Sequence, residues 1–300
     1  MFDKATLLRH GATRSDLRHL EHRRLGGETG GAGYRYQGHF AAVAMLRAAA
    51  EYTDSGQDAE ITQEVLCWVD DVLVRTGVAK FYQLKISPLE SWGRARRKLA
   101  KEFERQHRLC RSANVTHSLH LVTPHKNRVA HFNAKAPASF RTVFSAEHFP
   151  LQRLRPQYWA AGGAANTAVR RLCAVDADSA AERDEVAARL ISIWEDCGTP
   201  SDPQLVSAVL TKAWADPEVP IRRPNAPTPP RWSAVTAAAS RVPGLALLLR
   251  DGFVCWEFRR PGGAKESGRI GASDSDAVAR VIARVLARPP SDFDDFWREL

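Results

Sequence analysis

In the first half of the chain, a segment with a helical pattern of hydrophobic residues is followed by segments with the pattern of strands. An Ala-rich run over about 36–52 predicts a helix, because alanine and leucine favour helical backbone. Two apolar runs, 61–75 and 78–86, then predict the strands of a β-hairpin, with Thr76-Gly77 between them. A shorter run predicts another strand over 119–123. Together these elements indicate an α/β core.

The middle of the chain has helical spacing, and a proline-rich stretch follows it. Apolar residues recur three and four positions apart over about 160–215, which predicts a small helical region. Asp176 or Ser179 is a suitable N-cap for its central helix, and Gly198 is a suitable stop. Prolines crowd residues 216–231, which we therefore interpret as a linker or an extended strap.

The rest of the chain combines helical and strand patterns. A helix is predicted near 232–240, followed by a hairpin whose Asp251-Gly252 pair is a strong turn signal. Residues 274–287 have the spacing of an amphipathic helix. Near the end, Asp294-Asp295 lies among aromatic residues, in a segment interpreted as a packing lid, with a docking peptide as the alternative. Residues 232–300 are thus predicted to form a small α+β module.

The first residues do not have the pattern of a secretion signal, and no apolar run reaches the length of a membrane span. Residues 1–25 are polar and arginine-rich, which predicts a flexible basic arm. The glycines of 26–33 predict a loop but not a phosphate-binding P-loop, because no strand precedes them and no G-K-[ST] follows. We therefore expect a cytoplasmic protein without membrane contact. Its 300 residues fit one large domain or, more comfortably, two, and a hydrophobic content of 44% suffices for their cores.

The cysteines and histidines have no metal-binding spacing. The 5 cysteines are scattered, odd in number and without a C-x-x-C pair, so neither a disulfide framework nor a zinc site is predicted. Positions three apart on a strand face opposite sides, so His117 and His120 are a poor metal-binding pair. We interpret the histidines of this region as structural or surface residues: His117, His120, His125 and His131.

Basic residues are concentrated after the predicted hairpin. The net charge of +9 and the pI near 9.6 favour a polyanionic partner. Residues 91–111 have helical spacing, with apolar side chains on one face and basic side chains on another. The basic face is either an ordinary solvated surface or a contact to the DNA backbone. The candidates for that contact are Arg94, Arg97, Lys98, Lys101 and Arg105.

The predicted hairpin carries polar side chains of metal-binding type. Asp70-Asp71 lies in its first strand, while Gln83 and Lys85 lie near the end of the second, two residues apart and hence on one face. Charged groups inside buried strands are costly unless they are paired or bind a metal. A hairpin that brings Asp71 toward Gln83 and Lys85 would place a carboxylate, an amide oxygen and an ammonium around one point. That combination suits a divalent metal held against a phosphodiester.

The order of these motifs resembles a known nuclease family. Along the chain they are Gly33-Tyr34-Arg35-Tyr36-Gln37, the Ala-rich helix, Glu64, Asp70-Asp71 and Tyr82-Gln83-Leu84-Lys85. This order resembles the PD-(D/E)XK restriction-endonuclease-like superfamily in its Q-x-K variant. It is similar to the N-terminal double-stranded DNA endonuclease domain of bacterial anti-phage defence effectors, the CBASS-associated and Lamassu-type nucleases. The resemblance implies an α/β fold with a restriction-endonuclease-like core over 26–155, a mixed sheet flanked by helices.

The resemblance also implies roles for the matching residues of the hairpin. Asp71 would be the principal ligand of Mg²⁺ or Mn²⁺, with Asp70 as the alternative, because adjacent strand residues face opposite sides. Gln83, in place of the second acid, would coordinate the metal through its side-chain oxygen. Lys85 would orient the attacking water and stabilise the developing charge.

Two further residues match the family pattern less directly. Glu64 begins the predicted strand that carries Asp71 and is a candidate second ligand. Gln37 stands near the start of the helix, where the wider superfamily often has a metal-binding glutamate. Two interpretations of Gln37 stay open, a ligand and a hydrogen-bonding residue at the helix end.

We therefore expect a Mg²⁺-dependent DNA endonuclease that acts as an anti-phage effector on double-stranded DNA. The resemblance implies that it is held inactive until a signal or a separate sensor protein releases it, and that it forms a homo-oligomer when active. The alternative is a catalytically vestigial subunit that binds DNA or assembles a defence complex, which the glutamines at 37 and 83 favour. A third alternative is a protein-interaction factor whose basic helix serves only solubility.

Overall fold

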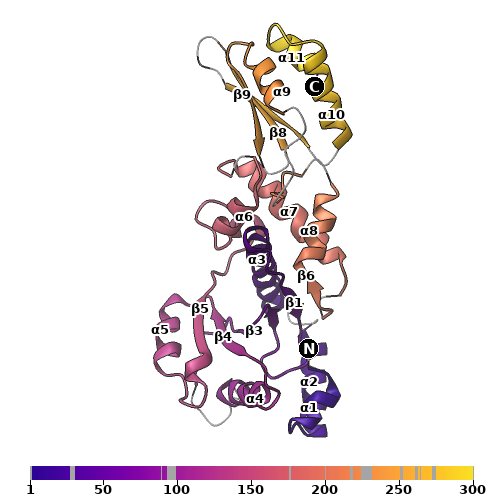
Figure 1. Cartoon of the computed structure of the whole chain (residues 1–300). Coiled ribbons are helices and arrows are strands. Elements are labelled where there is room, and N and C mark those ends of the chain that lie inside the picture. The colour runs from indigo at the N-terminus through magenta and orange to yellow at the C-terminus, as the bar shows by residue number, and fades with distance from the viewer. Residues whose placement is uncertain are drawn as a thin grey trace.

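The chain forms an α/β structure in which a six-stranded mixed sheet, a helical region and a three-stranded sheet follow one another along an elongated molecule (Figure 1). The computed structural model describes residues 2–27, 31–88, 90–92, 99–175, 177–199, 201–216, 219–223, 232–250, 253–260, 263, 265–271 and 275–299. Within these ranges, no helix combines the length and the hydrophobicity needed to cross a membrane.

The large sheet has the strand order β5-β4-β3-β2-β1-β6. Its strands are β1 (Glu60–Gln63), β2 (Val72–Arg75), β3 (Ala79–Leu84), β4 (His117–Thr123), β5 (Phe144–His148) and β6 (Gln204–Leu205). From β6 to β3 neighbouring strands are antiparallel, whereas β3, β4 and β5 are parallel. Parallel neighbours need a crossover, and the two crossovers contain the helices α4 (Leu99–Ser112) and α5 (Lys126–Ala134).

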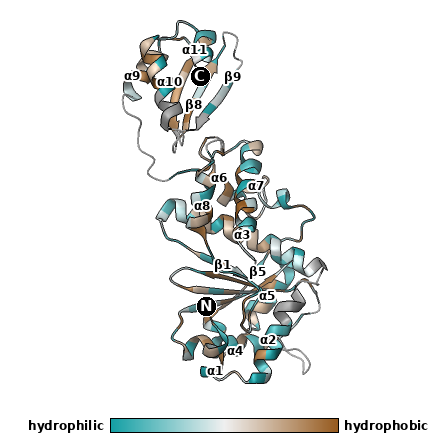
Figure 2. Ribbon diagram, turned by 90° about the vertical axis from the view of Figure 1, so that its right-hand side faces the viewer, coloured by the Kyte–Doolittle hydropathy of each residue, from teal (hydrophilic) through white to brown (hydrophobic). Residues whose placement is uncertain are grey.

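Helices cover both faces of this sheet, which gives three layers (Figure 2). The faces are set by alternation along the strands: Val72 points to one side and Leu73 to the other. On the Val72 side pack α3 (Gly31–Ser55), α6 (Asn166–Leu172), α7 (Ala180–Asp196) and α8 (Val206–Trp214). On the Leu73 side pack α1 (Lys4–Arg9), α2 (Arg14–Gly27), α4 and α5.

The strand predicted over 61–75 is wrong as a single element. It is a hairpin of β1 and β2, joined by residues 64–71. The pairing continues into that loop, because Glu64 N donates to Asp71 O at 3.1 Å and Val65 N donates to Asp70 O at 2.7 Å. The sequence hides the turn, since residues 65–69 in the middle of the loop are apolar and the loop contains neither glycine nor proline.

The segment predicted as a flexible arm over 1–25 instead contains helix α1 and most of helix α2 among its described residues. Asp3 caps α1 by accepting a 2.6 Å hydrogen bond from Thr6 N. Leu7, Leu17 and Leu20 are buried in the core on the Leu73 side of the sheet. These few leucines anchor a segment whose many arginines suggested disorder.

Most predicted helices are confirmed, with shifted ends. The Ala-rich helix is α3, which is longer than predicted at both ends. The helix predicted over 91–111 is described from Leu99 as α4, and residues 93–98 lie outside the described residues. In the helical region, Ser179 caps α7 by accepting a hydrogen bond from Glu182 N, whereas the other candidate, Asp176, lies outside the described residues.

The C-terminal module consists of α9 (Trp232–Ala239), β7 (Leu245–Arg250), β8 (Phe253–Arg259), β9 (Lys265–Gly271), α10 (Ser275–Ala287) and α11 (Phe293–Glu299). Arg250 pairs with Phe253 across the predicted hairpin, whose turn residues Asp251-Gly252 lie outside the described residues. The strand β9 was not predicted, because its sequence is polar. Phe293 of α11 stacks on Phe258 at 3.9 Å between ring centroids, which supports the packing-lid interpretation.

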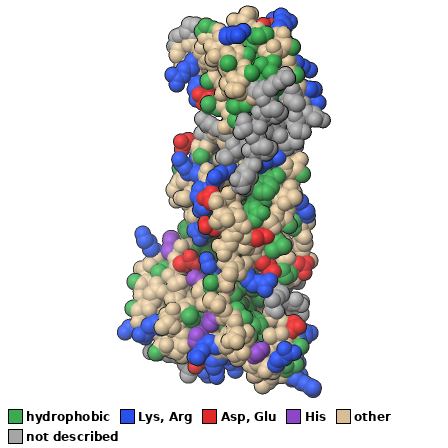
Figure 3. All heavy atoms as spheres, viewed as in Figure 1, with side chains coloured by type: hydrophobic (Ala, Val, Ile, Leu, Met, Phe, Trp, Pro, Cys, Tyr) green, Lys and Arg blue, Asp and Glu red, His purple; other side chains and the backbone are tan. Residues whose placement is uncertain are grey.

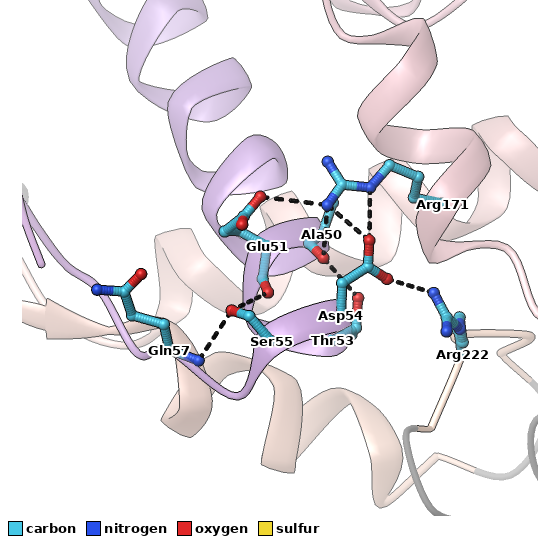
Figure 4. A network of polar contacts seen from close by, with 8 residues as sticks. All are labelled: Ala50, Glu51, Thr53, Asp54, Ser55, Gln57, Arg171 and Arg222. Atoms are coloured by element: carbon cyan, nitrogen blue, oxygen red, sulfur yellow. Dashed lines mark hydrogen bonds and ion pairs between the residues drawn. The ribbon is translucent and has the colours of Figure 1, made fainter.

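Ion pairs fasten the helical region to the end of α3 (Figure 4). The Asp54 carboxylate accepts hydrogen bonds from Arg171 of α6, at 2.9 and 2.7 Å, and from Arg222 of the predicted linker. Arg171 also pairs with Glu51. In the same strap, Ile221 is buried and forms a bridge with Cys173 at the end of α6. The described part of this strap is therefore packed rather than free.

Candidate active site

Four predicted site residues from separate segments meet at one end of β2 and β3. Gln37 comes from the first turns of α3, Glu64 follows β1, Asp71 precedes β2 and Gln83 lies in β3. Since Val72 pairs with Tyr82 in the antiparallel register, Asp71 lies opposite Gln83. The hairpin turn over 64–71 brings Glu64 back opposite Asp71, so the two acids lie on different strands of the hairpin and not on one strand as predicted.

Gln37 joins the helix to the hairpin. Its Nε2 donates a hydrogen bond of 2.8 Å to Glu64 Oε1 and another of 2.8 Å to the backbone oxygen of Asp71. The side chain of Gln37 is buried, so both N–H groups of its amide are used inside the protein. Gln37 therefore holds the first acid and the backbone of the second in a fixed relation.

The Asp71 carboxylate is fixed by the third strand of the sheet. Its Oδ2 accepts hydrogen bonds from Gln83 Nε2 at 2.5 Å and from the backbone N–H of Leu84 at 2.6 Å. Gln83 is 0% exposed, so its amide is held rigidly by packing. A carboxylate held by two donors has little freedom to rotate, which is the preorganisation that a ligand or a catalytic acid needs.

Glu64 has a left-handed backbone conformation, with φ of 50°. For a residue with a Cβ this region costs about 1–3 kcal/mol, and such strain concentrates at functional sites. The conformation lets the backbone turn sharply out of β1 while Glu64 N still donates to Asp71 O. The side chain, 8% exposed, is thereby directed back to Gln37.

Lys85 and Asp70 flank this group. Lys85 follows Gln83 by two positions, and its backbone N–H donates to Val122 O at 2.9 Å, which keeps the extended course beyond β3. Its side chain is half-buried and forms no ion pair within the described part of the chain. Asp70 is buried, and its backbone oxygen pairs with Val65 N. The hydrogen bonds that join α3, the hairpin and β3 run through Asp71.

The two acids of this group carry the type of ligand atom that Mg²⁺ prefers. Asp71 and Glu64 supply carboxylates, and Mg²⁺ commonly binds through one or two carboxylates together with waters and substrate oxygens. In the described ranges, no three residues of the His, Cys, Asp and Glu types gather as a metal cluster. Gln83 turns its N–H to Asp71, so coordination of a metal through its side-chain oxygen would require the amide to turn over and give up this hydrogen bond. The set lacks one negative charge relative to an acid at 83.

The predicted contacts to the DNA backbone fare less well. Arg105 forms an ion pair with Asp16 of α2 at 3.2 Å, and its guanidinium lies 4.3 Å from the ring centre of Trp68. It therefore fastens α2 to the hairpin loop and is not the free phosphate contact that the helical spacing suggested. Lys101 is exposed, and Arg94, Arg97 and Lys98 lie outside the described residues. On the face shown in Figure 3, lysines and arginines are dispersed rather than gathered in one patch.

The histidines of β4 are structural, as predicted. His120 lies between Ser118 Oγ at 2.7 Å and Ser145 Oγ at 2.9 Å, and it stacks on Tyr82. Burial, together with the nearby Lys80 ammonium, lowers the pKa of His120 to about 4. His120 is therefore neutral near neutral pH.

Sequence reasoning missed Gln106, which shapes the loop between the two acids. This residue of α4 is completely buried, and its Oε1 accepts hydrogen bonds from Trp68 N at 3.0 Å and Val69 N at 3.4 Å. The available signal was a glutamine between Phe103 and Leu109, on the apolar face of the helix. A polar residue on that face must find a buried partner.

Comparison with known proteins does not assign these residues. No family model, no curated protein and no solved structure matches the chain. The hydrogen-bonded group formed by Gln37, Glu64, Asp71 and Gln83 is called the acid–amide cluster from here on, and Lys85 follows it two positions beyond Gln83.

Proposed function

We propose that the chain is a metal-dependent DNA endonuclease with a restriction-endonuclease-like core. The observation that carries the proposal is the acid–amide cluster, in which three separate segments meet around two carboxylates and two amides beside a lysine. The order of elements supports it, because an acid precedes the strand before a Q-x-K strand and a polar residue of the flanking helix reaches the same point.

Each residue has a distinct task in this proposal. Asp71, Gln83 and Glu64 would hold Mg²⁺ or Mn²⁺, which when bound supplies charge neutralisation and an acidified water. Gln37 positions Glu64 by its hydrogen bond. The Lys85 ammonium would orient the attacking water and stabilise negative charge on the phosphoryl oxygens. Hydrolysis joins the water oxygen to phosphorus and breaks one bond from phosphorus to a sugar oxygen; this oxygen takes up a proton and leaves as a hydroxyl, while the proton lost by the water passes to solvent.

In the cell, the proposed role is the effector of a bacterial anti-phage defence system that cleaves double-stranded DNA. The motif resemblance supports this role. The part of the chain after residue 160, which contains the helical region and the C-terminal module, contributes no residue to the acid–amide cluster. This remainder would restrain the nuclease, bind a separate sensor protein or drive a homo-oligomer when the system is activated.

Plasmid cleavage tests the proposal. Supercoiled plasmid is incubated with Mg²⁺ or Mn²⁺ and with wild type, Asp71→Ala or Lys85→Ala, with and without lysate of phage-infected cells. Circular dichroism establishes that each variant is folded. Cleavage by wild type and by neither variant supports the nuclease proposal. If wild type cleaves only when lysate is present, the result also supports an effector that a signal activates. Equal cleavage by a folded Lys85→Ala protein would count against the site.

A vestigial DNA-binding or assembly subunit is the second candidate. The observation that favours it is the hydrogen bond from Gln83 to Asp71, which satisfies the carboxylate without a metal. A binding subunit keeps its DNA affinity and its cellular phenotype when Lys85 is replaced by alanine. Intact plasmid in every reaction, with DNA still bound, would favour this candidate.

A further inference from the structure

A small cavity adjoins the acid–amide cluster on the α3 side. Its volume is about 170 Å³, and it lies between α3, β1, β6 and the end of α7. Two lining residues are direct neighbours of cluster residues: Gly38 follows Gln37, and Gln63 precedes Glu64. The cavity is smaller than the sites of about 300–1,000 Å³ that take drug-sized ligands, so it suits a single small ring system.

Two buried polar groups of the cavity lining lack partners. Trp194 is 5% exposed and Gln204 is 9% exposed. Neither Trp194 Nε1 nor Gln204 Oε1 has a hydrogen-bond partner among the described residues. An unsatisfied buried group costs about 1–3 kcal/mol, so native proteins rarely leave one without a reason.

Other indoles of the chain show the usual arrangement. The Nε1 atoms donate to a backbone oxygen in Trp92 and Trp214, and to the Asp184 carboxylate in Trp159. Trp194 therefore differs from three tryptophans of the same chain. The unsatisfied N–H and C=O groups thus belong to two residues that line one small cavity, and a ligand that reached them would need both an acceptor and a donor.

The mouth of the cavity adds an aromatic ring and a cation. Tyr34 is exposed on α3 and can stack on a planar ligand. Arg155 also lines the cavity and pairs with Glu195, from which a phosphate could draw it. A planar heterocycle with donor and acceptor atoms, attached to phosphates, has the chemistry of a nucleobase in a nucleic acid strand.

We propose that this cavity receives one unstacked nucleobase of the nucleic acid substrate. The inference rests on the proposed nuclease function and adds a substrate preference to it: strands with an accessible base, single-stranded or distorted, bind better than a regular duplex. Trp194 and Gln204 are positioned to hydrogen-bond the base edge, and Tyr34 to stack on its face.

A binding experiment with and without bases tests this. The full chain carrying Lys85→Ala keeps the probes intact, and fluorescence anisotropy measures Kd for a labelled single-stranded deoxyoligonucleotide and for its abasic counterpart of equal length. Trp194→Phe and Gln204→Met each remove one polar atom while preserving size. We expect each to weaken binding of the base-bearing strand about 3- to 10-fold, the equivalent of one hydrogen bond, and to leave the abasic strand unaffected.

Trp297→Phe serves as the matched control, because Trp297 is 56% exposed on α11; it should bind both probes like the parent chain. Two outcomes would overturn the inference and leave the nuclease proposal standing. In the first, both cavity variants bind the base-bearing strand with the Kd of the parent chain; in the second, they lose the same affinity for both probes. If the parent chain binds neither probe and wild type leaves plasmid intact, the proposed function itself fails.

Discussion

Replacing Gln37 by glutamate tests the hydrogen bonds of the acid–amide cluster and its metal together. Gln37 Nε2 donates 2.8 Å hydrogen bonds to Glu64 Oε1 and to the backbone oxygen of Asp71. Gln37→Glu removes both donors and sets a second carboxylate against Glu64, which is buried. The variant also supplies the acid that the wider superfamily often has on this helix.

The magnitude follows from the two lost hydrogen bonds. A bond to a charged group contributes about 1.5–3 kcal/mol and a neutral one about 0.5–1.5 kcal/mol, so their loss destabilises the fold by about 2–4 kcal/mol. Repulsion between the carboxylates adds to this unless one of them takes up a proton. A divalent cation between them reverses the effect, because it binds only the folded state and stabilises it by mass action.

Thermal unfolding, followed by circular dichroism in chelator and in Mg²⁺, measures both effects. Gln37→Glu should unfold several degrees below wild type in chelator and regain most of the loss in Mg²⁺. The uncharged control, Gln37→Leu, should lose stability in both solutions. If Gln37→Glu unfolds at the wild-type temperature in chelator, the two hydrogen bonds of Gln37 do not stabilise the fold as argued. If its unfolding temperature is lowered equally in chelator and in Mg²⁺, the proposal that a metal binds at this site is refuted.

Three further predictions concern the surroundings of the site. Burial holds the pKa of His120 near 4 in the folded protein, whereas it is about 6.5 in the unfolded chain. The contribution of neutral His120 to the free energy of unfolding is therefore complete above pH 6.5 and falls by about 3 kcal/mol as the pH is lowered to 4. His120→Asn should show a flatter pH dependence in urea unfolding. Asp54→Asn weakens the ion pairs to Arg171 and Arg222 and should cost about 1 kcal/mol, less in high salt, because Asp54 is partly exposed; melts at two salt concentrations check this. Gln106→Leu should speed amide exchange at Trp68 and lower cleavage, since the loop between the acids loses its acceptor; wild-type exchange there would contradict the assignment.

The spacing of apolar residues predicted those elements that are determined by residues close together in the sequence. The helix α3, the strands β3 and β4 and the three helices of the helical region each bury a regular apolar stripe, and all were predicted. The two-residue strand β6 was missed because it exists only by pairing with β1. The hairpin inside 61–75 was missed because it is held by Gln106, a residue of another element.

The candidate site was predicted in composition but not in geometry. Asp71 was expected to approach Gln83, and it does, whereas the role of Gln37 was left open and the structure shows it bonded to Glu64 and to the backbone of Asp71. Glu64 was expected on the strand of Asp71, whereas the turn places it opposite. The cavity could not be predicted at all, because Trp194 and Gln204 are more than a hundred residues from Gln37 along the chain. Only the packing of α7 and β6 beside α3 and β1 brings them there.

The most direct measurement of the central claim is the single-turnover rate of plasmid cleavage in Mg²⁺ for wild type, Lys85→Ala and Lys135→Ala. Lys135 is exposed after α5 and is the matched control for loss of one lysine. A nuclease with its site at the acid–amide cluster loses cleavage by about a hundredfold or more in Lys85→Ala and none in Lys135→Ala. Equal rates for all three folded proteins would contradict the account.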